Sequence, residues 1–107
     1  MHENGPASLH ELSRHLVVFA RRRDWEQYHS PKNLSMALIA EAAELVEHFQ
    51  WLSEEQSYQL APDKREEVRM ELADIQIYLL RIAERLDIDL LQAAWDKTQI
   101  NEGRFPV

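Results

Sequence analysis

The chain has 107 residues, of which 45% are hydrophobic and 29% charged, with a formal net charge of −7 and no cysteine. This composition is typical of one soluble globular domain. The acidic balance argues against a nucleic-acid polymer as a partner, because such binding needs a basic surface. The lack of cysteine excludes disulfides and thiolate metal sites, and the apolar runs are too short to span a membrane. We therefore expect a cytoplasmic or organelle-matrix protein with no membrane partner.

Only two glycines and four prolines interrupt long segments of strong helix formers, which predicts an all-α fold. Residues 1–7 contain Gly5 and Pro6 among polar residues and are expected to form a loose tail, so residues 8–107 form the single domain. Ser8 caps the first predicted helix, and Glu11 completes a capping box. This helix is expected to run to about Glu26, with an apolar stripe formed by Leu9, Leu12, Leu16, Val17, Phe19 and Ala20.

Three arginines, at residues 21–23, form a small basic cluster near the end of the first predicted helix. Their pattern favours a solvated helix end beside acidic neighbours over a phosphate-binding cluster. Three ring systems follow at Trp25, Tyr28 and His29, just before the helix-stopping Pro31. One interpretation is a hydrophobic lid on the end of the bundle. The other is a platform on which a nucleobase stacks, with its edge read by His29 or by Asn33.

The second helix is expected to start at a cap, Ser30 or Asn33, and to continue to about Trp51. Its predicted core stripe consists of Leu34, Leu38, Ala42, Leu45 and Phe49. A polar break covers about residues 53–62, and Pro62 begins a third helix that is expected to end near Leu86. The predicted core stripe of this third helix consists of Val68, Leu72, Ile75, Leu79 and Ile82.

Each of these two helices carries a pair of acids spaced i, i+3 among apolar residues: Glu41 with Glu44, and Glu71 with Asp74. The two pairs lie at similar distances from the break, about 13–15 Å at the helical rise, so an antiparallel hairpin brings all four level across one seam. Unpaired charges would repel there, and a hard divalent cation with oxygen ligands resolves the repulsion. The pattern therefore predicts a Mg²⁺ site that leaves room for substrate phosphates.

A di-iron site is the alternative for four carboxylates, but it needs Glu-x-x-His motifs on the helices. Only Glu26 and His29 have that spacing, away from the acid seam. Two further side chains are interpreted conservatively. We expect His48 to be an ordinary partly buried residue and Glu67 to pair with a nearby Lys or Arg, in preference to serving as metal ligands.

A fourth helix is expected from Leu90 to about Asn101, capped by Asp87 or Asp89. Its predicted inner face consists of Leu91, Ala94, Trp95 and Thr98. Lys97 and Asn101 are spaced i, i+4, and Arg104 follows. These groups either complement the negative end of the helix or provide the cationic and amide contacts that a triphosphate needs.

The segments EAAELVEHFQW, EVRMELADIQIYLL and DLLQAAWDKTQINEGRFPV resemble the MazG-type all-α nucleoside triphosphate pyrophosphohydrolases. Within them the chain is most similar to the dCTP pyrophosphatase branch, a likeness that FARRRDWEQYHSPKNL strengthens and that covers residues 9–107. The resemblance implies a four-helix fold that assembles as a dimer or a dimer of dimers, with sites at subunit interfaces. One departure is Ala43, where close relatives often carry glycine before the second glutamate.

The resemblance further implies Mg²⁺-dependent cleavage between the α- and β-phosphates of a (deoxy)nucleoside triphosphate, with dCTP or a modified dCTP as the expected substrate. By position it makes metal ligands of Glu41, Glu44, Glu71 and Asp74. It assigns base-pocket positions to Trp25, His29, Trp51 and Tyr78, and phosphate-side positions to Lys97, Asn101 and Arg104.

Our mechanistic hypothesis places two or more Mg²⁺ ions, with Mn²⁺ as the alternative ion, between the four catalytic acids and the triphosphate. Glu41 or Glu44 then takes the proton from the attacking water. Two other classes of function stay open. The first is a nucleotide-sensing or partner-binding helical module without catalysis, and the second is a bundle whose acids are structural and pair with arginines across a dimer.

Overall fold

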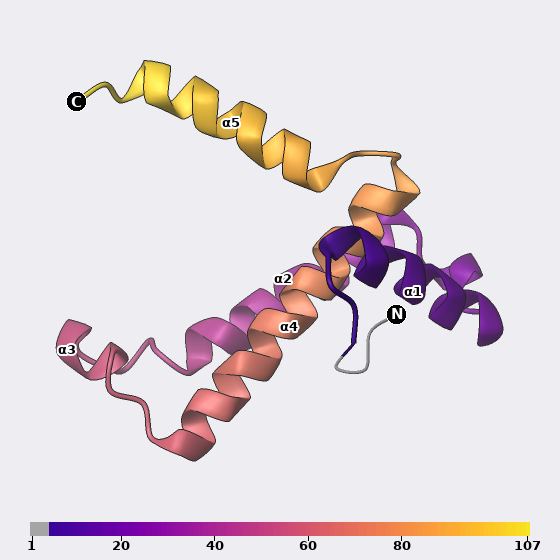
Figure 1. The fold of residues 1–107 in the computed structure, drawn as a ribbon. Coiled ribbons are helices and arrows are strands. Elements are labelled where there is room, and N and C mark those ends of the chain that lie inside the picture. The colour runs from indigo at the N-terminus through magenta and orange to yellow at the C-terminus, as the bar shows by residue number, and fades with distance from the viewer. Residues whose placement is uncertain (1–4) are drawn as a thin grey trace.

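The protein is built from helices, as predicted, and the computed structural model describes residues 5–107. Its elements are α1 (Leu9–Arg22), the 3₁₀ helix η1 (Glu26–Tyr28), α2 (Pro31–Glu47), α3 (Glu54–Ser57), α4 (Pro62–Arg85) and α5 (Leu90–Arg104) (Figure 1). Residues 1–4 of the expected tail lie outside the described residues. Among residues 5–107, none of the helices combines the length and the apolarity that crossing a lipid bilayer requires.

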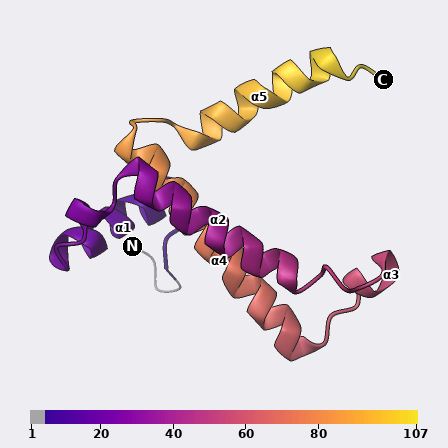
Figure 2. The same ribbon diagram turned by 180° about the vertical axis from the view of Figure 1, so that it is seen from behind.

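The centre of the fold is an antiparallel hairpin formed by α2 and α4, which lie side by side over most of the length of α2 (Figures 1 and 2). Helix α1 packs against α4, near the end of the hairpin opposite α3. Among the described residues the buried apolar side chains are few: Ala20, Leu34, Val68, Leu80 and Ala83. This small core follows the seams where α2 and α1 meet α4, and it holds the faces of α2 and α4 in register.

Polar side chains begin most of the helices. The hydroxyl groups of Ser8, Ser30 and Ser53 each accept a hydrogen bond at 3.1 Å from the backbone N–H three residues on. Asp89 caps α5 in the same way, with its Oδ1 3.0 Å from the nitrogen of Gln92. The expected capping box at Ser8 is only half formed, because the Glu11 carboxylate accepts from Ala7 N–H at 2.6 Å instead of from Ser8. A complete capping box occurs at Ser53, with Gln56.

Two aspartates end helices in a conformation that glycine usually provides. Asp24 has φ 57° and Asp87 has φ 54°, both in the left-handed region. The N–H of Trp25 donates to the Ala20 carbonyl at 2.9 Å, and that of Asp24 donates to Arg21 at 3.1 Å. The same pair of bonds recurs after α4, and it is the Schellman pattern that satisfies the last carbonyls of a helix. The predicted end of α1 was near Glu26, but the helix ends at Arg22 because this stop signal follows it.

Helix α5 runs apart from the α2–α4 hairpin in both views (Figures 1 and 2). The four long helices expected from the sequence are therefore present, but within one chain they do not close into a bundle. The expected inner face of α5 is open: the exposed fractions of Leu91 and Trp95 are 73% and 59%. The helix also continues to Arg104, beyond its predicted end near Asn101.

The predicted core stripe of α4 is correct only in part. Val68 is buried, but Leu72 is 53% exposed and Leu79 is also exposed, whereas the structure buries Leu80 and Ala83. The reason is that α2 covers only one side of α4, while α1 and the segment that follows it cover other sides of its C-terminal half. The predicted stripe of α2 is closer to the observed one, with Leu34 buried and the other four residues partly buried.

Candidate active site

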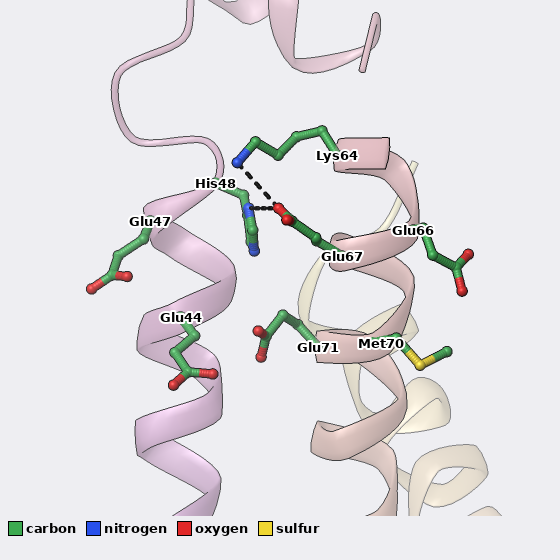
Figure 3. A pocket seen from close by; sticks show the side chains of 8 residues that line it. All are labelled: Glu44, Glu47, His48, Lys64, Glu66, Glu67, Met70 and Glu71. Atoms are coloured by element: carbon green, nitrogen blue, oxygen red, sulfur yellow. Dashed lines mark ion pairs between the residues drawn. The ribbon is translucent and has the colours of Figure 1, made fainter. Parts of the chain in front are cut away.

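The carboxylates of α2 and α4 meet across the hairpin seam, as the sequence predicts. Glu41 and Glu44 project from α2 and Glu71 projects from α4, and one oxygen of each lies within 4.8 Å of the others. Glu71 and Glu44 point toward one another between the two helices (Figure 3). The antiparallel pairing places these residues level because their spacings from the α3 connection are nearly equal. Three of the four predicted acids therefore form one cluster.

Glu41 bears the electrostatic consequence of this cluster. The neighbouring Glu71 carboxyl group, with which a protonated Glu41 can share its proton, then burial, then the proximity of Glu44 and Asp74 raise the pKa of Glu41 from 4.5 to about 7. Sharing a proton between two carboxyl groups is the usual response when like charges are held close together. In the metal-free chain the Glu41 carboxyl group therefore retains its proton to a higher pH than an isolated glutamate does.

The donor set fits a hard divalent cation. All three side chains offer carboxylate oxygens, which Mg²⁺ and Mn²⁺ prefer. The Oε2 atoms of Glu41 and Glu71 are buried without a hydrogen-bond partner, an arrangement that costs free energy unless an ion or a proton satisfies them. None of the ion pairs found among residues 5–107 joins a lysine or arginine to the cluster. The cluster is therefore not a set of internally neutralised structural acids within one chain.

Asp74 and Tyr78 extend the acidic face along α4. Asp74 lies outside the group of mutually close oxygens, but its charge contributes to the raised pKa of Glu41. Burial first, and then the charges of Glu41 and Asp74, raise the pKa of Tyr78. The phenol of Tyr78 is therefore protonated at neutral pH, and it lies within electrostatic range of the carboxylate cluster.

An open cleft of about 730 Å³ adjoins the cluster on the side of α3 (Figure 3). Its lining includes Glu44 and Glu71 and continues to His48, Lys64 and Glu67. Glu67 Oε2 lies 3.1 Å from Lys64 Nζ and 3.8 Å from His48 Nδ1. Both conservative interpretations from the sequence agree with this geometry, since Glu67 pairs with a lysine and the His48 side chain is partly buried.

The aromatic segment after α1 lies at the other end of the hairpin. Trp25 packs edge-on against Phe19, with ring centroids 5.6 Å apart, and its ring centroid is 6.2 Å from that of His29. Trp25 and Tyr28 are exposed and His29 is partly buried. The packing on Phe19 fits the lid interpretation, and the exposed faces leave the stacking interpretation open. The Asn33 amide is engaged locally, because it donates to the Tyr28 carbonyl at 3.1 Å.

Within one chain, the other predicted substrate residues lie far from the aromatic segment (Trp51) or from the carboxylate cluster (Lys97, Asn101 and Arg104). Trp51 follows α2 and is 87% exposed, whereas His29 precedes α2, and a 17-residue helix separates them by about 25 Å. Lys97, Asn101 and Arg104 are exposed on α5, which runs apart from the hairpin (Figure 1). The structure thus brings the carboxylates together but leaves the predicted base and phosphate contacts on separate parts of the chain.

Two arginines near the aromatic segment were missed in the sequence. Arg81 is only 3% exposed, and its Nη2 lies 3.4 Å from His29 Nδ1. Arg85 Nη1 lies 3.7 Å from Glu26 Oε1. A charged residue inside the apolar run LLRIA was the available signal, since a buried arginine is rare without a partner.

Two paired helices with level carboxylates and buried unpaired oxygens define an all-α protein whose acidic cluster could hold a metal ion. The family model described as MazG-like matches residues 37–106, and the chain belongs to the MazG-like family. This confirms the resemblance noted from the sequence.

The particular relatives are pyrophosphatases. The chain is similar to dCTP pyrophosphatase 1 of Mus musculus, at 42% identity over 102 residues, and of Homo sapiens, at 40% identity over 101 residues. These matches cover 94% and 92% of this chain but only 60% and 59% of the relatives. The chain thus spans about three fifths of the length of the curated proteins it matches. The crystal structure of a pyrophosphatase from Archaeoglobus fulgidus DSM 4304 superposes with a TM-score of 0.88 at 34% identity, covering 100% of this chain and 99% of that one.

Proposed function

We propose that the chain is a Mg²⁺-dependent nucleoside triphosphate pyrophosphohydrolase that converts dCTP, or a modified dCTP, into the monophosphate and pyrophosphate. The observation that carries the proposal is the Glu41, Glu44 and Glu71 cluster with its unpaired buried oxygens. Similarity to dCTP pyrophosphatase 1 and to a solved pyrophosphatase supports the reaction class and the choice of base.

Glu41, Glu44, Glu71 and Asp74 would hold two or more divalent ions in this reaction, and Mn²⁺ is the alternative to Mg²⁺. Bound divalent cations supply charge neutralisation and alignment for in-line attack on a polyphosphate. Water attacks at phosphorus, the bond between the α- and β-phosphates breaks, and pyrophosphate leaves. One carboxylate that the metal ions do not fully engage, Glu41 or Glu44, accepts the proton of the attacking water.

We also infer that the site is completed by a second copy of the chain, in a dimer or a dimer of dimers. Two observations support this. His29 and Trp51 stand at opposite ends of α2, so one chain does not gather them around a base. Large apolar side chains also remain exposed on the helices, among them Ile39, Leu72, Leu91 and Trp95. In this arrangement Trp25, His29, Trp51 and Tyr78 surround the base, and Lys97, Asn101 and Arg104 contact the phosphates.

The decisive assay is incubation with dCTP and MgCl₂ followed by detection of dCMP and pyrophosphate. Alanine at Glu41, Glu44, Glu71 or Asp74 should abolish turnover while the helical circular dichroism signal persists. Glu47→Ala is the matched control, because Glu47 is an exposed acid of α2 that borders the cleft but lies outside the carboxylate cluster and points away from α4 in Figure 3. Near-normal turnover in any two of the four variants would rule out the proposed role of the cluster.

The shared site has its own test. Glu71→Gln and Trp51→Ala each disable one side of the site, so each variant alone should be slow. If one copy supplies the carboxylates and the other supplies Trp51, mixing the two variants restores an intact site in a fraction of the hybrid dimers. Activity of the mixture equal to the sum of the separate activities would contradict sharing.

A nucleotide-sensing module without catalysis is the competing function. It predicts that a non-hydrolysable dCTP analogue binds in titration calorimetry while dCTP itself is never consumed. Structural acids paired across a dimer predict instead that neither Mg²⁺ nor the analogue binds.

A further inference from the structure

The C-terminal part of α4 holds the aromatic segment through two arginines one helical turn apart. Arg85 Nη1 lies 3.7 Å from Glu26 Oε1, which Arg21 Nε also approaches at 3.3 Å. Arg81 Nη2 lies 3.4 Å from His29 Nδ1. Glu26 begins η1 and His29 is the residue that caps its C-terminal end, so the two arginines contact both ends of this single turn. The position of His29 is consequently tied to α4, the helix that carries Glu71 and Asp74.

Arg81 is costly as a purely structural residue. Its side chain is 3% exposed, its Nη1 donates to Glu84 Oε2 at 2.9 Å, and its Nε is buried with no hydrogen-bond partner. A buried guanidinium with an unpaired donor gains less than it loses in hydration, and an apolar residue of similar volume often serves a core as well or better. The contact with His29 offers a reason for its presence that packing does not.

The chemistry of that contact determines where the imidazole proton resides. A guanidinium has only donors, so the His29 Nδ1 facing it must accept, and the single proton of a neutral ring is then on Nε2. The charged groups around the ring are Arg81, Arg85 and Glu26. Burial first, then Arg81 and Arg85, lower the pKa of His29 below 6.5, and the opposing effect of Glu26 is smaller. The ring is therefore neutral at physiological pH.

We propose that Arg81 is a positioning residue that fixes His29 with its proton on Nε2, so that the ring offers an N–H donor to a hydrogen-bond acceptor on the nucleobase. The inference rests on the proposed function, which places His29 at the base. A donor at this position favours a base that presents a carbonyl oxygen or an unprotonated ring nitrogen, both of which cytosine has. A base that presents an amino group there meets an unpaired donor and is disfavoured.

The tautomer can be read directly, without turnover. Long-range ¹⁵N–¹H correlation spectra of the 107-residue chain should show His29 with unprotonated Nδ1 and protonated Nε2. In Arg81→Met the Nδ1 signal should move toward a mixture of tautomers. Arg69→Met is the matched control, because Arg69 lies on the same helix and makes the same kind of i, i±3 pair, with Glu66 at 2.8 Å, but is exposed. It should leave the His29 spectrum unchanged.

The KM for dCTP, measured with Mg²⁺, then tests whether the His29 tautomer affects binding of the nucleobase. Loss of one oriented hydrogen bond should raise the KM of Arg81→Met about tenfold with kcat nearly unchanged. The same substitution in a His29→Phe background should add little, because Arg81 acts through His29. Arg81→Lys keeps a cationic donor, so it should preserve the tautomer and a KM close to that of the wild type. It serves as the test if Arg81→Met does not fold.

A wild-type His29 with its proton on Nδ1, or identical tautomers in wild type and Arg81→Met, would overturn the proposal. So would a changed tautomer with an unchanged KM, or full additivity of Arg81→Met and His29→Phe. A wild-type protein that consumes no dCTP would instead overturn the proposed function. The spectra, which need no turnover, would still decide whether Arg81 sets the tautomer.

Discussion

Replacing Glu41 by glutamine should remove activity and, at the same time, stabilise the metal-free protein. The cluster holds Glu41 against Glu71 and Glu44, and this proximity raises the pKa of Glu41 from 4.5 to about 7. The unfolded chain gives up this proton at its ordinary pKa, whereas the folded chain retains it to higher pH. Stability from this group is therefore fully present below pH 4.5 and is lost as the pH rises to about 7. Glutamine is neutral throughout and avoids the loss.

The full pKa difference corresponds to about 3 kcal/mol, at about 1.4 kcal/mol for each pH unit. Glu41 is partly open to solvent, which screens the repulsion, so we expect Glu41→Gln to stabilise the protein by about 1–2 kcal/mol above pH 7. For a chain of this length that is a rise in melting temperature of about 4–12 °C. The gain should shrink toward zero as the pH falls to 4.5.

The measurement is urea or thermal unfolding followed by circular dichroism in EDTA, at one chain concentration and at several pH values between 4.5 and 8. Glu47→Gln removes an acid from the same helix outside the cluster and should show no such pH-dependent gain. Added Mg²⁺ should stabilise the wild type more than Glu41→Gln, because the variant lacks one ligand. Equal stability of the variant and wild type at pH 8 in EDTA, or a difference independent of pH, would refute the reasoning.

Four further substitutions test the fold and the site. Asp87→Gly should stabilise the fold by about 1 kcal/mol, because Asp87 has φ 54°, a left-handed conformation that glycine adopts without strain. Asp96→Gly inside α5 should destabilise the fold by a similar amount. The melting temperatures of the two variants, from thermal unfolding, test both expectations. Leu34→Ala should cost about 2–4 kcal/mol in urea unfolding, since Leu34 is 2% exposed, and a loss below 1 kcal/mol would contradict its place in the core. Trp51→Ala should leave the monomer fold intact but raise the KM for dCTP about tenfold or more through lost stacking, and an unchanged KM would remove Trp51 from the base pocket.

The elements that could be predicted are those whose signals are local. Ser30 and Pro31 mark the start of α2, and Pro62 marks the start of α4. The spacing of the acids from the α3 connection places Glu41, Glu44 and Glu71 together. A hairpin needs only short-range pairing, so helical period and connection length suffice to give its register. This is why the metal-ligand candidates could be found without coordinates.

The packing partners of the helices and the contact between Arg81 and His29 could not be predicted, because the helical period of a sequence does not encode long-range contacts. An apolar stripe shows that a face will be covered but not by which element, and Leu72, Leu79 and Trp95 stay exposed within one chain. For this reason the expected inner face of the fourth helix is uncovered within one chain. Arg81 was missed because a charged residue in an apolar run gives no indication of its distant partner, and His29 is 52 positions away in sequence.

Asp87, the aspartate that follows α4, fixes the direction in which α5 and its cationic side chains leave the hairpin. Asp87 sets the direction in which α5 leaves, and the Ile88 N–H bonded to the Ala83 carbonyl at 2.8 Å locks that direction. Because α5 has 15 residues and is about 22 Å long, a swing of about 10° at this pivot displaces Arg104 by about 4 Å. The direction of α5 thus depends on the backbone conformation at Asp87. Lengthening the Leu86–Asp89 connection by a single residue should displace Lys97, Asn101 and Arg104 together.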